Sequence, residues 1–366
     1  MIHIFIGTKA QFIKVAPVLQ QLTKQSISYR LIDSCQHKDI TKDLRLLFSI
    51  REPDVYLDAG FSNINSMRKA FLWSGKILLR LIISKRRFKQ EVFGSAPDGI
   101  CLIHGDTLST LLGLITAKSC GIKVAHLEAG LRSFDIFNPF PEELIRIICM
   151  RYSDFLFTPS AWASENLNKM GIKGTVFSVH ANTIIDALDY IVHQNPNEEL
   201  NLKKPYCTVS IHRFENIFSK KRLQSIINLI ISLSKDMTIY FMLHQPTHDK
   251  LHRMNMLKSL HGNSKIHMVP LEQYNNFIRL LSGAEFIITD GGSIQEESYA
   301  LNVPCLLMRE KTERQDGLGE NVCLSKFDTE TIQKFLNSYK SFRRKNLSDA
   351  YHPSENIVAI LHEISH

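Results

Sequence analysis

Short apolar runs alternate with helical segments along almost the whole chain, and this alternation limits the possible folds more than any other feature. In the first half, candidate strands lie at 3–7, 29–33, 99–103, 123–127 and 155–158. The alternation restarts with candidate strands at 175–179, 206–211, 239–243, 266–269, 286–289 and 304–308. Strands that alternate with helices form parallel, doubly wound sheets. We therefore predict an α/β protein with two Rossmann-like domains around a central cleft.

The junction between the two domains is expected near Gly171–Gly174. This gives an N-terminal domain over 1–170, a second domain over 171–352 and a final helix over 353–366 that packs back on the first domain. A length of 366 residues suits two domains of ordinary size.

The composition is that of a globular protein, with 44% apolar and 22% charged residues. No apolar run reaches the roughly 20 residues needed to cross a bilayer, and the N-terminal residues are typical of a first strand rather than a leader peptide. Seven cysteines without a close pair indicate free thiols in a reducing compartment. We therefore expect a cytoplasmic protein.

The net charge of +8 is unevenly distributed. No acid lies between Asp58 and Glu91, whereas this stretch carries Arg68, Lys69, Lys76, Arg80, Lys85, Arg86, Arg87 and Lys89. On a helical wheel Lys69, Lys76 and Arg80 share a narrow face, opposite the apolar residues Met67, Phe71, Leu78, Leu81 and Ile82. Such a helix can pack its apolar face on its own domain, or it can lie on an anionic membrane surface. A peripheral membrane contact through 68–89, at the inner face of the cell membrane, therefore stays open beside the packed alternative.

Three carboxylates between Ile100 and Arg146 are candidates for proton transfer. The apolar runs at 99–103 and 123–127 lead to Asp106 and Glu128, and parallel strands end at the edge where open sheets bind ligands. Glu142 follows Pro141 at a predicted helix start. Acids in such places also serve as caps and turns. Carboxylates in one cleft can nevertheless move protons on and off carbon, provided that their environments separate their pKa values.

Three motifs in this stretch, in this order, resemble those of the UDP-N-acetylglucosamine 2-epimerase family: His-Gly-Asp-Thr at 104–107, His-Leu-Glu-Ala-Gly-Leu-Arg at 126–132 and Phe-Pro-Glu-Glu at 140–143. The similarity continues over nearly the whole chain. It implies a GT-B-like architecture and acid/base roles for Asp106, Glu128 and Glu142. Arg132 and Arg146 match arginines of the same motif blocks and are candidate substrate-binding residues.

The first strand leads into a glycine turn and a helix that contains Lys9 and Lys14. The turn does not follow the GxGxxG pattern of nicotinamide sites, but a helix start with nearby lysines suits an anionic group. The family has arginine, proline and glutamate where this chain has Lys9, Ala10 and Gln11, whereas Lys14 matches. Lysine cannot copy the forked hydrogen bonding of arginine. We therefore expect Lys9 and Lys14 to bind substrate, with an altered contact at Lys9.

In the second half, two loops after predicted strands are candidate nucleotide-binding segments. His212 and Arg213 follow the run at 206–211, and the resemblance places both near the diphosphate, with His212 as a catalytic candidate. The family usually has a second arginine where Phe214 stands. Asp290 opens the other loop, in which small residues at a helix start suit a phosphate.

The resemblance also assigns the parts of the nucleotide. Gly291, Gly292 and Ser293 would hold the diphosphate, although the family writes Ser-Gly-Gly there. Glu297 would bind the ribose and Phe277 the uracil, and Thr312-Glu313-Arg314 matches a further motif, so Arg314 is a candidate substrate contact. His244, His248 and His252 have metal-like spacing, but Pro246 interrupts it. We expect no metal and no cofactor.

The reaction implied by the resemblance inverts C2 of a UDP-2-acetamido sugar through elimination and re-addition of UDP. The product would supply N-acetylmannosamine-type sugars for surface polysaccharide synthesis. Two alternatives stay open: a hydrolysing 2-epimerase that releases UDP and N-acetylmannosamine, and a membrane-associated GT-B glycosyltransferase, since fold alone does not choose between them. The expected partners are a UDP-sugar and a second copy in a homodimer, and no nucleic acid.

Overall fold

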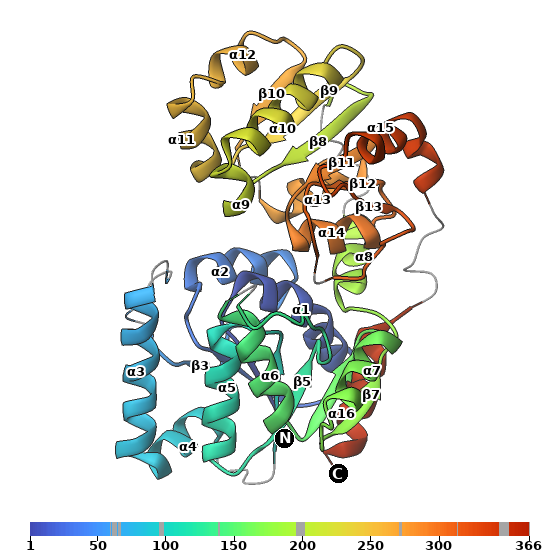
Figure 1. Ribbon diagram of the computed structural model, residues 1–366. Coiled ribbons are helices and arrows are strands. Elements are labelled where there is room, and N and C mark those ends of the chain that lie inside the picture. Colours follow the sequence, from blue (N-terminus) through green and yellow to red (C-terminus); the bar gives the residue numbers. More distant parts are fainter. Residues whose placement is uncertain are drawn as a thin grey trace. The chain divides into compact units, whose positions relative to one another are not determined.

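The computed structural model describes residues 1–58, 60, 64, 67–94, 99–137, 140–194, 202–270, 273–312, 314–343 and 351–365. Glu313 of the predicted motifs and the side chain of Met67 lie outside this description. The chain forms two compact units (Figure 1): unit 1 comprises Met1–Ala187 with Tyr351–His366, and unit 2 comprises Leu188–Ala350.

Unit 1 contains, within the described ranges, a seven-stranded parallel sheet in the order β3-β2-β1-β4-β5-β6-β7. Its strands are β1 (Ile2–Ile6), β2 (Tyr29–Asp33), β3 (Val55–Tyr56), β4 (Ile100–His104), β5 (Lys123–Leu127), β6 (Phe155–Thr158) and β7 (Thr175–Ser178). Its helices are α1 (Lys9–Lys24), α2 (Lys38–Leu47), α3 (Met67–Ile83), α4 (Lys85–Phe93), α5 (Leu108–Ser119), α6 (Glu142–Tyr152), α7 (Ala161–Lys169) and α16 (Pro353–Ile364).

Unit 2 contains, among its described residues, a six-stranded parallel sheet in the order β10-β9-β8-β11-β12-β13. The strands are β8 (Tyr206–Ser210), β9 (Thr238–Met242), β10 (Ile266–Val269), β11 (Phe286–Thr289), β12 (Cys305–Leu307) and β13 (Val322–Leu324). The helices are α9 (Phe214–Ile217), α10 (Lys220–Leu233), α11 (Gln245–Arg253), α12 (Leu257–His261), α13 (Tyr274–Ser282), α14 (Gly292–Ala300), α15 (Thr329–Ser338) and the 3₁₀ helix η1 (Tyr339–Phe342). Helix α8 (Ile184–Gln194) begins in unit 1 and ends in unit 2.

The two parallel sheets confirm the predicted α/β class, but the junction differs from the expected position at Gly171–Gly174. The run that was expected to open the second domain is β7, which pairs with β6 in the first sheet. A strand adds to the nearest open sheet edge because its backbone groups need partners, and β6 offers that edge. The division between the units therefore falls within α8, and α16 returns to unit 1, where it packs on α1.

The strand order places a topological switch point in each sheet. In unit 1 the chain runs outward from β1 through β2 to β3 and then resumes at β4, on the other side of β1. In unit 2 it runs from β8 through β9 to β10 and resumes at β11, on the other side of β8. Open α/β sheets bind ligands at the carboxyl ends of the strands at such a point. The loops after β1, β4, β8 and β11 are therefore the first places to look for a site.

Helix α3 packs on unit 1 through a different face from the one that the helical wheel suggested. Its buried residues are Ala70, Trp73, Ile77 and Leu81, and the Trp73 indole donates a hydrogen bond to the Ser34 carbonyl at 2.9 Å. Of the predicted apolar face Leu81 is buried, but Phe71 and Ile82 are exposed. The packing follows the large indole ring, because a fully buried tryptophan with a bonded N–H anchors the helix. In the part of the chain that the structure describes, no helix is both long enough and apolar enough to span a bilayer.

Candidate active site

The loop after β4 and helix α6 form a charged network in unit 1. Asp106 follows β4 and forms an ion pair with the Arg146 guanidinium of α6. A second nitrogen of Arg146 lies 2.6 Å from Glu143 Oε2. Arg132 binds the other oxygen of Glu143, and the Ser133 N–H donates to Oε2 at 3.1 Å. This network fixes the predicted Asp106, Arg132 and Arg146 relative to one another.

Glu143, which the sequence analysis did not single out, is the centre of this network. Its side chain is fully buried. Burial alone raises the pKa of the Glu143 carboxyl, but the hydrogen bonds from Arg132 and Ser133 and the charge of Arg146 outweigh it and hold the pKa below its ordinary value. Glu143 is therefore ionised at neutral pH and orients two arginines. The doubled glutamate of the motif was a signal for it, since buried arginines need a buried acid.

Glu142 has a different environment. It is the first residue of α6, and Pro141 is the N-cap residue rather than the first helical residue that was predicted. Among the described residues, Glu142 Oε2 is buried and has no hydrogen-bond partner. Glu142 thus has no ion-pair partner among the described residues, whereas Asp106 is paired with Arg146. The chain thus supplies carboxyl groups in unlike surroundings, which general acid–base chemistry requires.

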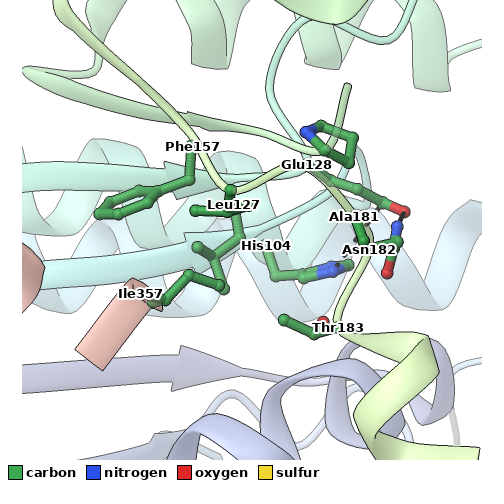
Figure 2. A pocket seen from close by; sticks show the side chains of 10 residues that line it. His104, Leu127, Glu128, Phe157, Ala181, Asn182, Thr183 and Ile357 are labelled. Carbon is green, nitrogen blue, oxygen red and sulfur yellow. Dashed lines mark hydrogen bonds and ion pairs between the residues drawn. The ribbon is translucent and has the colours of Figure 1, made fainter. Parts of the chain in front are cut away.

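Glu128 follows β5 and forms an ion pair with Lys14 of α1. Asn182 Nδ2 donates to the same carboxylate oxygen, Oε1, at 2.5 Å, and His104 Nε2 lies 3.8 Å from Oε2. Figure 2 shows the side chain of Asn182 turned toward Glu128, with the His104 ring nearby, around a cavity of about 10 Å³. The structure therefore brings together the predicted Lys14 and Glu128, and it adds His104 and Asn182.

Neutral and capping groups complete this edge of the sheet. His126 lies on β5, two residues before Glu128, and is completely buried. Burial lowers the pKa of His126 to about 4, so the ring is neutral at pH 7. Thr8 and Gln11 form a capping box at the start of α1, and Gln11 also donates to the His104 carbonyl at 2.9 Å. Gln11, a departure from the family pattern, thus has a structural task here. Lys9 is the first residue of α1, half-buried, and its N–H lies 3.4 Å from His37 Nδ1.

In unit 2, Asp290 organises the loop after β8. Its buried carboxylate accepts hydrogen bonds from the N–H groups of His212 and Arg213, each at 3.0 Å, and from Asn216 Nδ2 at 3.0 Å. Burial lowers the pKa of His212, although the charge of Asp290 opposes this effect. Asp290 thereby fixes the backbone that carries the two predicted residues.

The start of α14 carries one departure from the family pattern. A Cβ atom at Gly291 would lie 2.8 Å from His212 Cε1, so a side chain at this position would require the imidazole ring to shift. Gly292 is the first residue of α14 and Ser293 the second, and Ser293 is exposed. The serine of this loop therefore stands where there is room for a side chain, and the N-terminal end of α14 can still attract an anion.

The remaining predicted residues of unit 2 lie around α14. The Tyr274 hydroxyl donates to Glu297 Oε1 at 2.9 Å, and the ring of Tyr274 stacks on that of Phe277 with centroids 6.1 Å apart. Arg314 forms an ion pair with Glu296, and its carbonyl accepts from Gln295. Sequence reasoning missed Tyr274, which joins Phe277 to Glu297.

The three histidines with metal-like spacing, His244, His248 and His252, take part in ring stacking. His248 and His252 stack on α11, and His244 stacks on His212 with ring centroids 4.5 Å apart. Within the described ranges, no group of three or more His, Cys, Asp and Glu side chains is placed to hold a metal ion. Phe214 is exposed and stacks on Phe218 at 4.1 Å.

Two parallel α/β units, each with polar groups at the carboxyl ends of its switch-point strands, define a GT-B-like protein of the kind that handles nucleotide sugars. The family model for UDP-N-acetylglucosamine 2-epimerase matches residues 20–362. The chain belongs to the UDP-N-acetylglucosamine 2-epimerase family.

Individual relatives are similar over most of their length. The UDP-N-acetylglucosamine 2-epimerase of Methanococcus maripaludis is 33% identical over 333 residues, which cover 87% of this chain and 86% of the relative. The enzyme of the same name from Campylobacter jejuni is 30% identical over 391 residues, covering 98% and 97%. The structure of the Methanocaldococcus jannaschii UDP-GlcNAc 2-epimerase, in complex with UDP-GlcNAc and UDP, has a TM-score of 0.79 at 29% identity and covers 99% of both chains.

Proposed function

We propose that this chain is a nucleotide-sugar 2-epimerase that inverts C2 of UDP-N-acetylglucosamine or a related UDP-2-acetamido sugar. One observation carries the proposal: at the carboxyl ends of the adjacent strands β4 and β5, Asp106 and Glu128 are each paired with a cation from a helix. A carboxylate that is held in place by a fixed partner can act as a general base toward a bound substrate. Glu142, whose Oε2 has no hydrogen-bond partner within the described part of the chain, adds a carboxyl group in a different environment.

The proposed reaction proceeds in two halves. A carboxylate removes the C2 proton, the C1–oxygen bond breaks and UDP leaves with the electron pair. UDP then adds back to C1 of the glycal while a carboxyl group returns a proton to the opposite face of C2. The bond changes balance without a cofactor, and the product keeps its UDP.

Unit 2 is proposed to bind the UDP. Its support is the start of α14, where Gly291 is the N-cap residue and Gly292 and Ser293 open a helix whose N-terminal end favours an anionic group such as a diphosphate. Arg213 and His212, held by Asp290, supply further donors beside this helix start. Glu297 is the proposed ribose acceptor and Phe277 the uracil contact, while Lys9, Lys14, Arg132, Arg146 and Arg314 are further proposed substrate contacts.

The product distinguishes the possible outcomes. Proton NMR of UDP-N-acetylglucosamine with purified protein should show the signals of UDP-N-acetylmannosamine, at a fixed final ratio and without accumulation of UDP. Steady accumulation of UDP and free N-acetylmannosamine would instead identify the hydrolysing enzyme. The protein should also be tested with diacetamido and uronic UDP-sugars. If none of these substrates changes, the epimerase proposal is refuted.

We also propose that unit 1 contacts an anionic membrane through α3 and α4. Five large apolar side chains of α3 are more than half exposed: Phe71, Leu72, Leu79, Ile82 and Ile83. Exposed apolar surface of this extent marks an interaction site. The cations of 68–89 flank this face, and the nearest acids, Asp58 and Glu91, are already paired with Lys76, Arg80 and Arg87. A basic helix with an outward apolar face suits anionic lipid.

Vesicle sedimentation tests this contact. Phosphatidylglycerol-containing vesicles should retain the protein at low salt and release most of it at high salt, because salt screens exposed charge. Phe71→Ser with Ile82→Ser should abolish retention, while Leu46→Ser, an exposed apolar residue of α2, should not. Absence of retention at any salt would refute the proposal. The expected homodimer stays a prediction, which light scattering of the same variants checks.

A further inference from the structure

Asn182 is a buried side chain, only 8% exposed, whose amide group joins two elements of unit 1. Its nitrogen donates to Glu128 Oε1 at 2.5 Å, and its oxygen accepts from the Ile184 N–H at 3.1 Å. Ile184 opens α8, the helix through which the chain leaves unit 1. The residue therefore links a carboxylate at the end of β5 to the first turn of the connecting helix.

The residue whose carboxylate Asn182 contacts has an unusual backbone conformation. Glu128 has φ of 64°, in the left-handed region that non-glycine residues rarely adopt. Residues held in such conformations cluster at functional sites, where surrounding contacts must fix them. Here Lys14 and Asn182 both bind Oε1, whereas Oε2 lies beside His104. The two oxygens of the carboxylate are thus distinguished, one by two donors and the other by an imidazole.

We propose that Asn182 is a positioning residue for Glu128: its amide N–H, together with the Lys14 ammonium, fixes Oε1 and favours the ionised carboxylate. A hydrogen bond to the charged form of an acid stabilises that form. The titratable groups that face Glu128 include Lys14 from α1, His104 from β4 and the neutral His126 from β5. The effect of Asn182 on catalysis rests on the proposed epimerase function, whereas its effect on the ionisation of Glu128 does not.

Asn182→Asp separates the two tasks of the amide. Aspartate keeps an oxygen for the Ile184 N–H, and it is a favoured residue at helix starts. It cannot donate to Glu128, and it places a second negative charge beside that carboxylate. Both changes favour protonated Glu128, so the acidic limb of the kcat/KM profile should move to higher pH by about one unit or more. We expect kcat at pH 7 to fall about tenfold, within the range of a weakened acid–base group.

The control is Asn168→Asp, which adds the same charge at an exposed position of α7. Its pH profile should match that of the wild type. A merely structural role of Asn182 would lower the amount of folded protein without moving the acidic limb. An Asn182→Asp profile with its acidic limb at the wild-type pH would therefore overturn the proposal.

A second measurement does not depend on activity. Carbon-13 NMR of protein labelled at the glutamate carboxyl carbons follows Glu128 directly, with its signal assigned by its loss in Glu128→Gln. The titration midpoint should lie about one pH unit higher in Asn182→Asp than in the wild type. Equal midpoints would refute the positioning role even if the wild type is an active epimerase. A shifted midpoint in a protein without epimerase activity would uphold it and refute the proposed function alone.

Discussion

The strand ends of the two sheets carry polar groups that are held by different means. In unit 1, the side-chain cations Arg146 and Lys14 bind the strand-end carboxylates Asp106 and Glu128, and Arg132 binds Glu143 on the neighbouring helix α6. In unit 2, the buried carboxylate of Asp290 binds mainly backbone N–H groups, and Gly291 permits the close approach of His212. The ion pairs of unit 1 influence the protonation of its carboxyl groups, whereas the hydrogen bonds of Asp290 fix the conformation of a loop.

This difference matches a division of chemical tasks. Proton transfer needs carboxyl groups with separate proton affinities, which neighbouring charges provide. A diphosphate needs correctly placed N–H groups at a helix start, which a fixed backbone provides. Changes in unit 1 should therefore act on turnover and on its pH dependence, and changes in unit 2 on UDP binding.

The largest effect is expected from the carboxylates of unit 1. Asp106→Asn, Glu128→Gln and Glu142→Gln should each lower turnover by about 10²–10⁴-fold, the usual contribution of a positioned acid or base. Calorimetry should show UDP binding close to that of the wild type. Glu165→Gln, an exposed change on α7, is the control and should leave turnover unchanged. Loss of UDP binding in all three variants would contradict the division between the units.

The next effect concerns the stability of unit 1 in acid. Burial lowers the pKa of His3 from 6.5 to about 4, so the unfolded chain binds a proton there that the folded chain does not. Stability should then fall as the pH drops from 6.5 toward 4, by up to roughly 3 kcal/mol for this group. Both tryptophans, Trp73 and Trp162, lie in unit 1, and their fluorescence in urea reports on that unit.

His3→Leu should reduce this loss, because neither ring nitrogen of His3 has a hydrogen-bond partner among the described residues. His362→Gln, an exposed change on α16, should leave the loss as it is. A wild type whose urea midpoint stays constant from pH 7 to pH 4.5 would contradict this prediction.

A smaller effect is expected at the start of α14. Gly291→Ala places a methyl group 2.8 Å from His212 Cε1, which forces the ring or the loop to move. Overpacking of this kind costs about 1–3 kcal/mol, and UDP binding that requires the original position of the ring would be weakened by up to about 5- to 150-fold. The control Gly262→Ala meets its nearest neighbour at 3.4 Å and should bind UDP normally. Normal UDP binding by Gly291→Ala would show that the position of the His212 ring does not determine UDP affinity.

The smallest effect is expected from Tyr274→Phe, which removes one hydrogen bond to Glu297 and keeps the ring beside Phe277. A hydrogen bond to a charged group contributes about 1.5–3 kcal/mol, and solvent or ribose can replace part of it. UDP affinity should therefore fall roughly three- to tenfold, with turnover of bound substrate unchanged. A fall in turnover at saturating substrate would mean that Glu297 acts in the chemistry.

Much of the fold followed from the sequence because buried parallel strands are continuous apolar runs. The strands at Tyr29–Asp33, Lys123–Leu127 and Phe286–Thr289 have the bounds that were expected. The strands β3 and β13 are two and three residues long and were not recognised, since so short a run has no period. The junction was misplaced for a related reason: no local signal tells a strand which sheet edge it joins.

The site was predictable where a residue follows a strand directly, as Asp106 and Glu128 do. Asn182 and His104 were not singled out, because their importance depends on contacts with Glu128 from distant parts of the chain. Asn182 and Thr183 before an apolar helix were a signal for a helix start. No sequence signal indicated that the Asn182 amide also contacts Glu128.

The account stands on the transfer of a proton at C2, and hydrogen exchange measures this transfer directly. The wild-type protein is incubated with UDP-N-acetylglucosamine in heavy water, and the C2 position of recovered UDP-sugar is followed by NMR. We predict that deuterium enters C2 in both epimers at a rate comparable with turnover, and that Glu128→Gln slows it by about 10²–10⁴-fold. A wild type that turns over its UDP-sugar without deuterium at C2 would contradict the account and would indicate a glycosyltransferase.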